Sequence, residues 1–596
     1  MPEVWFEGLT LRSWRLGNFK SVREATVQLA PLTVVVGGNS AGKSTLLQSI
    51  RVASQAANSD LSVFPLNGEQ FRPGTFAETR FAGAEEAEPI EIGGEFNLGP
   101  FRSGYFERST NAGPYVNRHR PRRRRDEDVK LSWHLNLHGT PADQSAATNV
   151  QAVKVTASQG EELHVELTVN AIRGARDRGF GRDQRYTGTV NYGEHFEPVE
   201  DVSLSGGFPQ ELLREVDLAN DLFWKWQETQ SLSVRSNVSR LAGSEERAEP
   251  REVDEGVLVD RIVSDLRKAV DDSPQAASRH TAERLLSVRL RELIYSDPVS
   301  VSWTTDLVVK VATAVSERLG WHARGTRSMS MPDLMDDALD EVRFFLANRV
   351  QHLGPLRMDP QVVYRSSPAS QPGFIGAKGE YSASVLQTSG RQMTSGAPMP
   401  PDWSAPRHHR PTLSQAVNAW AAHLGIGDSF ETTDQGRLGL QLFVKQPDVD
   451  IELDLTSVGT GVSQLLPVLV MCLHAPPGSL LLIEQPELHL NPGVQQRLAD
   501  FFLAIARSGR QLLLETHSDY LVSRLRLRAA EDDDESTQEL IRVVFAERTN
   551  GVTSYHEAAP ARDGSMATWP AGFFEEAAHD SYALLTAMLE RRDDHG

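Results

Sequence analysis

Three short apolar runs in this chain have the pattern of strands buried on both faces. Thr33 to Val36 is rich in β-branched residues, Leu480 to Ile483 is entirely apolar, and a third run within "RQLLLETHSDYLVSRL" ends at a histidine. Continuous apolar runs of this length are typical of the interior strands of a parallel sheet. The chain is therefore expected to have an α/β fold built on such a sheet.

Alternating apolar and polar positions predict an antiparallel layer near the amino end. The segment "LRSWRLGNFKSVREATVQLAP" alternates, turns at Gly17-Asn18 and returns, which indicates a β-hairpin. "IEIGGEFNLG", "VKLSWHLNLHG" and "EELHVELTVNAIR" alternate in the same way. We expect residues 85–205 to form an antiparallel β layer beside the first buried strand.

From Pro209 to about Asn348 the apolar positions follow a helical period, from "QELLREVDLANDLFWKW" to "DLMDDALDEVRFFLANRV". No heptad register survives three repeats, which favours a compact helical insert over a coiled-coil arm. Contact with a partner is the expected task of this insert.

The chain of 596 residues is too long for one hydrophobic core. The patterns divide it into four expected parts: an amino-terminal lobe with the β layer (1–205), the helical insert (206–350), a carboxy-terminal lobe (351–545) and a strand and helix extension (546–596).

Composition narrows the functional classes. A net charge of -19 argues against a uniformly basic nucleic-acid coat protein. Cys472 is the only cysteine, so neither an internal disulfide nor a thiolate metal cluster is possible. The first 20 residues have no apolar stretch suited to a signal peptide, and no apolar window of about 20 residues predicts a membrane span. We expect a cytoplasmic protein with no membrane contact.

Residues 31–50, "PLTVVVGGNSAGKSTLLQSI", contain the P-loop pattern between a strand and a helix, which is the context that this motif requires. The backbone N–H groups of such a loop surround phosphate oxygens, its lysine reaches the β and γ phosphates, and its serine hydroxyl binds Mg²⁺. A nucleoside triphosphate with Mg²⁺ is therefore the expected ligand. The expected binding residues are Gly37, Asn39, Ser40, Gly42, Lys43, Ser44 and Thr45.

Far downstream, "DLTSVGTGVSQLLPVLVMCL", "LLLIEQPELHLNP" and "RQLLLETHSDYLVSRL" follow one another. This order resembles the ABC-class ATPase head, in which a signature turn, a Walker B strand, a D-loop and a switch histidine follow the P-loop. The resemblance implies ATP as the nucleotide, Glu484 as an Mg²⁺ residue and His517 as a γ-phosphate contact.

Two further sets of residues are implied by the same resemblance. Signature residues of this class meet the P-loop of a second copy, and here they are Ser457, Gly459 and Gly461. Asn18 and Lys20 match the "NF+S" segment of SMC-like ATPases, which lies near the base and ribose. A homodimer or higher homo-oligomer closed around ATP is therefore expected.

Longer phrases narrow the resemblance over residues 10–80 and 350–580: "HLGPLRMDP", "GAKGEYSASVL", "VGTGVSQLLPVL", "IEQPELHLNP", "ETHSDYL" and "WPAGFFEEA". They are similar to bacterial stand-alone ATPases grouped with the overcoming-lysogenization-defect type, often found in anti-phage defence operons. The Septu ATPase is a similar type of protein within this resemblance. This implies an ATPase that gates a separate effector, such as a nuclease. The TOPRIM pattern of the related nucleases has no match after His517, so we expect no nuclease activity in this chain.

The position after Glu484 departs from the pattern. ABC-class ATPases usually place there a second acid that activates water, and this chain has Gln485. A glutamine orients water but does not accept a proton at neutral pH. Because a general base contributes roughly 10²–10⁴-fold in rate, slow turnover is predicted. Glu487 is the nearest carboxylate able to take over as base; a strand-end or helix-cap role is its alternative.

Two other segments leave alternatives open. The run "NRHRPRRRRDEDVK", Asn117 to Lys130, is either a solvated loop or an arm that binds nucleic-acid phosphates. The alternative function, from a different class, is a DNA-repair or recombination clamp in which ATP closes two copies on duplex DNA. His408 and His409 lie in a Pro-rich loop, with no acid or thiol at ligand spacing, and are expected to be solvated.

Overall fold

The computed structural model describes most of both predicted lobes. The described residues are 8–59, 64–68, 71–85, 87–99, 127–139, 147–160, 163–172, 186–192, 195–199, 201–217, 324–329, 331–366, 373–401, 410–446, 451–532 and 536–566, with residue 583 and a few single residues between 259 and 314. The arginines of the basic run, His408, His409 and the phrase "WPAGFFEEA" lie outside the described residues.

A six-stranded sheet in the order β14-β18-β19-β3-β20-β21 forms the centre of the molecule. All neighbours are parallel except the last pair, which is an antiparallel hairpin. The strands are β14 (Val350–Leu353), β18 (Leu480–Glu484), β19 (Gln511–Glu515), β3 (Leu32–Gly37), β20 (Ile541–Thr549) and β21 (Val552–Ala558). Every residue of β3, β18 and β19 is buried, which confirms the three predicted interior strands.

This sheet separates two hydrophobic cores. Leu480 and Leu482 of β18 belong to the core shared with the amino-terminal layer, whereas Leu481 and Ile483 belong to the core of the carboxy-terminal helices. Successive strand residues point to opposite faces, so an apolar run is needed where both faces are covered.

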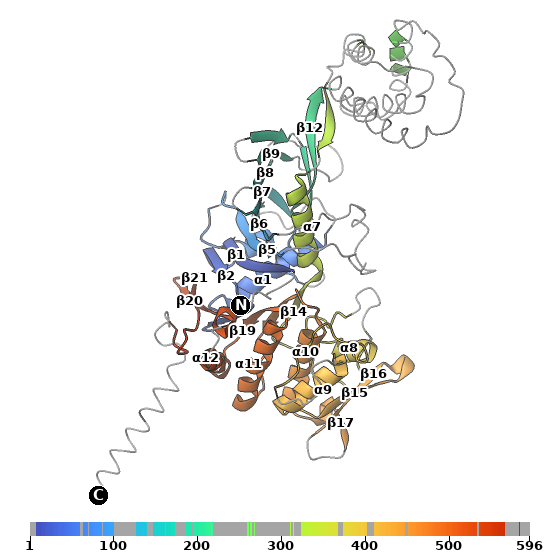
Figure 1. Cartoon of the computed structure of the whole chain (residues 1–596), viewed down its shortest axis with the longest axis vertical. Helices are drawn as coiled ribbons and strands as arrows, with labels where there is room; N and C mark the ends of the chain where they lie inside the picture. Colours follow the sequence, from blue (N-terminus) through green and yellow to red (C-terminus); the bar gives the residue numbers. More distant parts are fainter. Residues whose placement is uncertain are drawn as a thin grey trace.

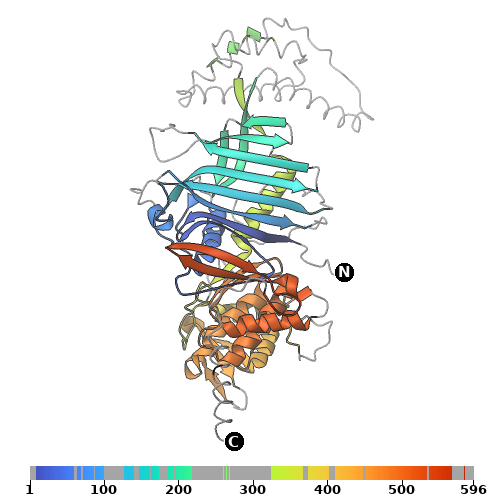
Figure 2. The same cartoon turned by 90° about the vertical axis from the view of Figure 1, so that its left-hand side faces the viewer.

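The predicted antiparallel layer is confirmed as a nine-stranded sheet in the order β10-β9-β8-β7-β6-β5-β1-β2, with β4 paired to β7. Its strands stack one beside another above the β20–β21 hairpin (Figure 2). They are β1 (Leu9–Phe19), β2 (Val22–Gln28), β4 (Phe64–Pro65), β5 (Ile90–Leu98), β6 (Val129–His138), β7 (Ala147–Gln159), β8 (Leu163–Ala171), β9 (Tyr186–Tyr192) and β10 (His195–Val199). The first hairpin turns at residues 20–21 rather than at Gly17-Asn18, because pairing continues to Phe19 and Val22.

Two helices lie between the antiparallel layer and the central sheet. Helix α1 (Lys43–Ala57) follows the P-loop, and α7 (Asp333–Asn348) packs against it. Arg343 of α7 ties the two together by donating from Nε to the Ala57 carbonyl at 3.1 Å. In Figure 1, α7 runs alongside the antiparallel strands toward β14.

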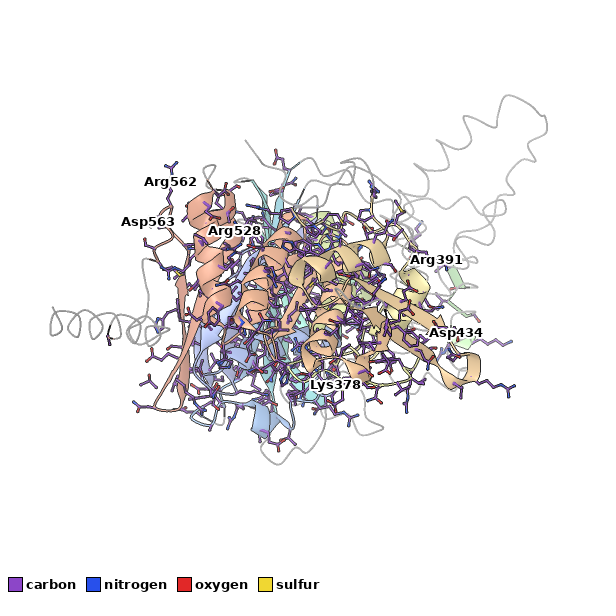
Figure 3. The ribbon with its side chains drawn as sticks, turned by 90° about the horizontal axis from the view of Figure 1, so that it is seen from below. Lys378, Arg391, Asp434, Arg528, Arg562 and Asp563 are labelled. Carbon is purple, nitrogen blue, oxygen red and sulfur yellow. The ribbon has the colours of Figure 1, made fainter. Side chains whose placement is uncertain are left out.

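The other face of the central sheet is covered by helices and a small antiparallel sheet. These are α8 (Ser382–Ser389), α9 (Leu413–Leu424), α10 (Thr460–His474), α11 (Pro492–Arg507), α12 (Asp519–Glu531), β15 (Ser429–Asp434), β16 (Leu440–Lys445) and β17 (Glu452–Asp454). Seen from below, Arg528 and Arg562 lie at one side of this lobe, and Arg391 and Asp434 lie at the opposite side (Figure 3). The shorter elements are α2 (Phe76–Thr79), α13 (Ser536–Leu540), η1 (Gly436–Leu438) and η2 (Leu455–Ser457).

The helical prediction for the insert is confirmed in one part and wrong in another. Helix α7 is confirmed. β12 (Phe208–Asp217) is instead a strand. It pairs antiparallel with β11 (Asp201–Ser205) and with β13 (Arg324–Met329), which falls between two predicted helices, in a three-stranded sheet. The strand ladder to β13 supplies backbone hydrogen bonds that a local pattern does not reveal. Most of the residues between β12 and β13 lie outside the described part.

Strand β20 crosses the expected boundary between residues 545 and 546, so the hairpin β20–β21 belongs to the central sheet rather than to a separate extension. Among the helices in the described residues, none is both long and apolar enough to cross a membrane.

Candidate functional site

The loop between β3 and α1 has the backbone conformation that its glycines permit. Gly42 has φ +98°, and a Cβ atom there would lie 2.4 Å from Oγ1 of Thr553. Thr553 itself donates to the Ala41 carbonyl at 2.9 Å, and Tyr555 donates to the Gly42 carbonyl at 2.8 Å. The β20–β21 hairpin therefore supports this loop from below, and only glycine fits at residue 42.

Lys43 begins helix α1 and folds back over its own loop. Its Nζ donates to the carbonyls of Gly37 at 3.0 Å and Gly38 at 2.8 Å. Burial lowers the pKa of Lys43, while the carboxylates of Glu515 and Glu487 oppose that shift. These two acids therefore lie within electrostatic reach of the P-loop lysine.

Ser44 contacts an acid at the end of β19. Its hydroxyl donates to Oε1 of Glu515 at 3.0 Å. Glu515 is only 5% exposed, and in the described residues its Oε2 has no hydrogen-bond partner. Burial raises the pKa of Glu515 to about 7; the Ser44 hydrogen bond opposes this shift and the Glu484 carboxylate adds to it.

Glu484 ends β18 and is held by a histidine from β14. Oε1 of Glu484 lies 2.6 Å from Nε2 of His352. Burial lowers the pKa of His352, which favours the neutral imidazole at pH 7. Nε2–H is then the donor to the carboxylate, since Nδ1 has no partner among the described residues.

The turn after β18 is fixed by backbone hydrogen bonds. Gln485 has a left-handed φ of +45°, and its N–H donates to the Glu515 carbonyl at 2.7 Å. Arg357 donates to the carbonyls of Glu484 and Gln485, both at 2.8 Å. Burial lowers the pKa of Arg357 to about 10, so the guanidinium stays charged at pH 7. The strand end is therefore held rigidly beside Glu515.

Glu487 connects this turn to the switch histidine. Its Oε1 accepts the backbone N–H of His517 at 2.7 Å. Burial raises the pKa of Glu487. His517 keeps much of its surface exposed, and the partial burial of its ring, together with the nearby Lys43 charge, lowers its pKa. The contact with Glu487 orients the loop that carries His517.

The signature turn stands apart from these residues. Ser457 and Gly459 are exposed, whereas helix α10 behind them is buried from Val462 to Leu473. The Ser457 hydroxyl donates to Oδ2 of Asp454 at 3.3 Å. A Cβ atom on Gly461 would lie 3.0 Å from the His489 carbonyl. In the described part of the chain, no hydrogen bond joins this turn to the P-loop.

Asn18 and Lys20 lie on the β1–β2 hairpin near the P-loop helix. Lys20 donates from Nζ to Oε1 of Gln48 at 2.5 Å, and Asn18 donates to the Pro89 carbonyl at 3.0 Å. A hollow of about 480 Å³ lies beside this hairpin. It is lined by Lys20, Ser21, Pro73, Ala77, Glu78, Arg80, Phe81, Ala82, Arg548 and Gly551.

The donor set at this sheet edge fits Mg²⁺ that arrives with a nucleotide. No group of three or more His, Cys, Asp and Glu side chains in the described residues is arranged to hold a metal ion alone. Mg²⁺ is commonly bound by one or two carboxylates together with substrate phosphates and water. The Ser44 hydroxyl and the unpartnered Oε2 of Glu515 supply oxygens of the required kind.

The structure thus brings together the predicted P-loop, Walker B and switch residues, but not the signature residues. Sequence reasoning missed Glu515, His352 and Arg357. Glu515 repeats the pattern of an apolar strand ending in an acid, and this repeat was the available signal. His352 and Arg357 both lie in the segment "HLGPLRMDP". This segment contributes to the family resemblance, but the sequence assigns no role to its individual residues.

Comparisons with known proteins agree with this arrangement. Residues 15–190 match a family model described as "AAA domain", and residues 385–523 match one described as "AAA domain, putative AbiEii toxin, Type IV TA system". No curated protein matches the chain. The chain thus carries AAA-type P-loop ATPase domain sequences on both sides of the insert.

Solved structures of SMC head domains are similar to the chain over most of its length. One from Pyrococcus furiosus, with an extended coiled coil bound to the C-terminal domain of ScpA, has 12% identity, covers 92% of this chain and 96% of that chain, and has a TM-score of 0.32. One from Thermotoga maritima has 10% identity, covers 92% of this chain and 98% of that chain, and has a TM-score of 0.29. The predicted α/β fold, with the P-loop on a central parallel sheet beside an antiparallel layer, is confirmed by the strand order of the two sheets.

Proposed function

We propose that this chain is a Mg²⁺-dependent ATPase that closes with a second copy around ATP and gates a separate effector, such as a nuclease, in bacterial anti-phage defence. The observation that carries the proposal is the shared edge of β3, β19 and β18. There Lys43 and Ser44 lie against Glu515, beside the end of β18. The AAA-type matches at both lobes support the ATPase part.

ATP would bind with its phosphates at the N-terminus of α1, where backbone N–H groups and Lys43 provide positive charge. Ser44 would hold Mg²⁺, with Glu484 acting directly or through water. When bound, Mg²⁺ neutralises phosphate charge that develops during transfer. The hollow beside Lys20 is the proposed place for the base and ribose.

Slow hydrolysis is the proposed consequence of Gln485. Its backbone is fixed by Arg357 and by the Glu515 carbonyl, so its amide starts from a defined position. A positioned amide orients water without taking its proton. Glu487 already accepts the His517 N–H, and this contact supports the strand-end alternative for Glu487 beside the role of base.

Dimerisation is proposed from the exposure of the signature turn. Ser457 and Gly459 present their turn to solvent, with the buried helix α10 behind them. The N-terminus of a helix favours phosphate, and none of the turn's hydrogen bonds in the described residues uses the chain's own P-loop. The P-loop of a second copy would complete the site. Such a dimer would release its effector when hydrolysis reopens it.

The defence role rests on the sequence resemblance and on the family description that names a toxin–antitoxin system. We expect the protein to act in the cytoplasm. Affinity purification followed by mass determination would identify the effector. ATPase stimulation by DNA alone, without a partner protein, would instead favour a DNA-repair or recombination clamp.

The test of the proposed function mixes two inactive variants. Lys43→Ala removes the P-loop cation, and Ser457→Arg blocks the signature turn. We expect each alone to lose Mg²⁺-dependent ATPase activity and the mixture to regain part of it, because a heterodimer keeps one intact composite site.

Leu438→Arg, at the 76% exposed end of η1, is the matched control for an added arginine and should keep full activity. Failure of the mixture to recover, with subunit exchange shown by mass measurement, would contradict a site shared between copies. An inactive wild-type chain would contradict the ATPase itself.

A further inference from the structure

The strand order places one acid nearer to the P-loop than the predicted Walker B acid. β19 lies between β18 and β3, and in its register Glu515 pairs with Glu484 on one side and with Val35 on the other. The two carboxylates lie on the same face of the sheet, because paired residues of parallel strands point the same way. Glu515 therefore lies one strand closer to Ser44.

Hydrogen bonds divide the two acids between different partners. The Ser44 hydroxyl donates to Oε1 of Glu515 at 3.0 Å, whereas Oε1 of Glu484 lies 2.6 Å from Nε2 of His352. The P-loop serine is thus oriented by the acid of β19. A serine hydroxyl that donates its proton to a carboxylate still has lone pairs for a metal ion.

The second oxygen of Glu515 points to a ligand. Buried side-chain oxygens are nearly always hydrogen-bonded. Oε2 of Glu515 is buried, and no described residue donates to it. Lys43, the nearest cation of the loop, donates instead to the carbonyls of Gly37 and Gly38. A small cation beside Ser44 would satisfy this oxygen.

We propose that Glu515 is a carboxylate of the Mg²⁺ site, with Oε1 orienting Ser44 and Oε2 facing the ion. This inference rests on the proposed binding of Mg²⁺ and ATP at the P-loop. It adds a metal-site residue from β19 to the strand-end acid of β18. It agrees with the preference of Mg²⁺ for one or two carboxylates beside substrate phosphates.

A purely structural role for Glu515 makes a different prediction. If the side chain only anchors Ser44, a glutamine with the same shape and an acceptor oxygen should replace it without loss. If it holds the metal, loss of its charge should weaken Mg²⁺ binding while the fold is kept. Glu515→Gln therefore separates the two roles.

The experiment measures ATP affinity by calorimetry in EDTA and in saturating Mg²⁺, for the full chain and for Glu515→Gln. We expect wild type to bind ATP more tightly with Mg²⁺. We expect the variant to lose roughly 10–100-fold of that gain, as is typical when a metal site loses a supporting group. In EDTA its ATP affinity should equal or exceed that of wild type, because one negative charge near the phosphates is removed.

A second readout uses Mn²⁺ in place of Mg²⁺ and follows bound Mn²⁺ by electron paramagnetic resonance in the presence of ATP. Glu515→Gln should bind Mn²⁺ more weakly than wild type. Glu431→Gln, an exposed glutamate on β15, is the matched control and should behave as wild type.

Equal Mg²⁺ gains in wild type and Glu515→Gln overturn the proposal. Loss of ATP affinity by the variant in EDTA also overturns it, because that result indicates a structural contact. A wild-type chain that binds no ATP in either buffer contradicts the proposed function instead. The two failures are therefore distinguishable.

Discussion

Strands β18 and β19 are neighbours with the same sequence pattern and different tasks. "LLLIE" and "QLLLE" are both fully buried, and both end in a glutamate at the same level of the sheet. Glu484 nevertheless contacts His352, whereas Glu515 contacts Ser44. The difference shows that the place of a strand in the sheet, rather than its local pattern, decides what its terminal acid can reach.

The turns after these two strands are also braced against each other. The Gln485 N–H donates to the Glu515 carbonyl, and Oε1 of Glu487 accepts the His517 N–H. A displacement of the His517 loop would therefore reach Gln485 through two short contacts. If His517 contacts the γ-phosphate as proposed, this bracing would couple the two strand ends to the nucleotide.

The largest expected effect comes from Glu484→Gln. We expect this variant to lose hydrolysis by roughly 100-fold or more, the scale of losing an acid–base or oriented electrostatic group. Its Mg²⁺-dependent gain in ATP affinity should change less than that of Glu515→Gln. Single-turnover hydrolysis and calorimetry on both variants measure the two effects.

The assignment of hydrolysis to Glu484 and of Mg²⁺ binding to Glu515 would be wrong if the two variants showed the opposite effects. A Glu484→Gln protein that hydrolyses ATP normally but has lost its Mg²⁺ gain would make Glu484 the principal metal carboxylate. Circular dichroism is the control for folding, because Glu484 is buried against His352.

A smaller effect is expected at the turn after β18. Glu487→Gln keeps an oxygen for the His517 N–H but removes the carboxylate, and we expect turnover to fall by roughly tenfold. Gln485→Glu should leave turnover equal or faster, since it places an acid where ABC-class ATPases usually have one. Steady-state phosphate release measures both variants.

Fast wild-type turnover that survives Glu487→Gln would remove Glu487 as a base. Orientation of water by Gln485 would then be the simpler account, and Glu487 would keep only its contact with the backbone of His517.

The sequence predicts this fold best where one pattern has one physical solution. A short apolar run of roughly 4–8 residues that is rich in β-branched residues or bounded by turns fits a strand covered on both faces, so β3, β18 and β19 are visible in the sequence alone. Residues 208–217 are different, because Leu212, Leu213 and Val216 also suit a helical period. Pairing with β13, far along the chain, decides for the strand.

For the site, as for the fold, the sequence predicts the local motifs but not the contacts between distant segments. The P-loop is recognisable in the sequence because its glycines, lysine and serine stand at fixed spacing in one short segment. The order of the strands in the sheet, in contrast, cannot be inferred from the spacing of motifs. That order is what brings Glu515 to Ser44, 471 residues apart. His352 likewise contacts Glu484, which lies 132 residues away in the sequence, and no local sequence pattern predicts that contact.

The smallest effect that still distinguishes the two strand ends is expected at His352. His352→Ala leaves a buried carboxylate oxygen of Glu484 without its donor, which should lower the free energy of unfolding by about 1–3 kcal/mol. Turnover should fall less than in Glu484→Gln, and the Mg²⁺-dependent gain in ATP affinity should be unchanged, because Ser44 and Glu515 keep their contact. His352→Gln, whose amide can donate, should recover part of the stability. Denaturant unfolding and calorimetry measure these quantities. A change in the Mg²⁺ gain as large as that of Glu515→Gln would mean that the two carboxylates act as one unit, despite their separate partners.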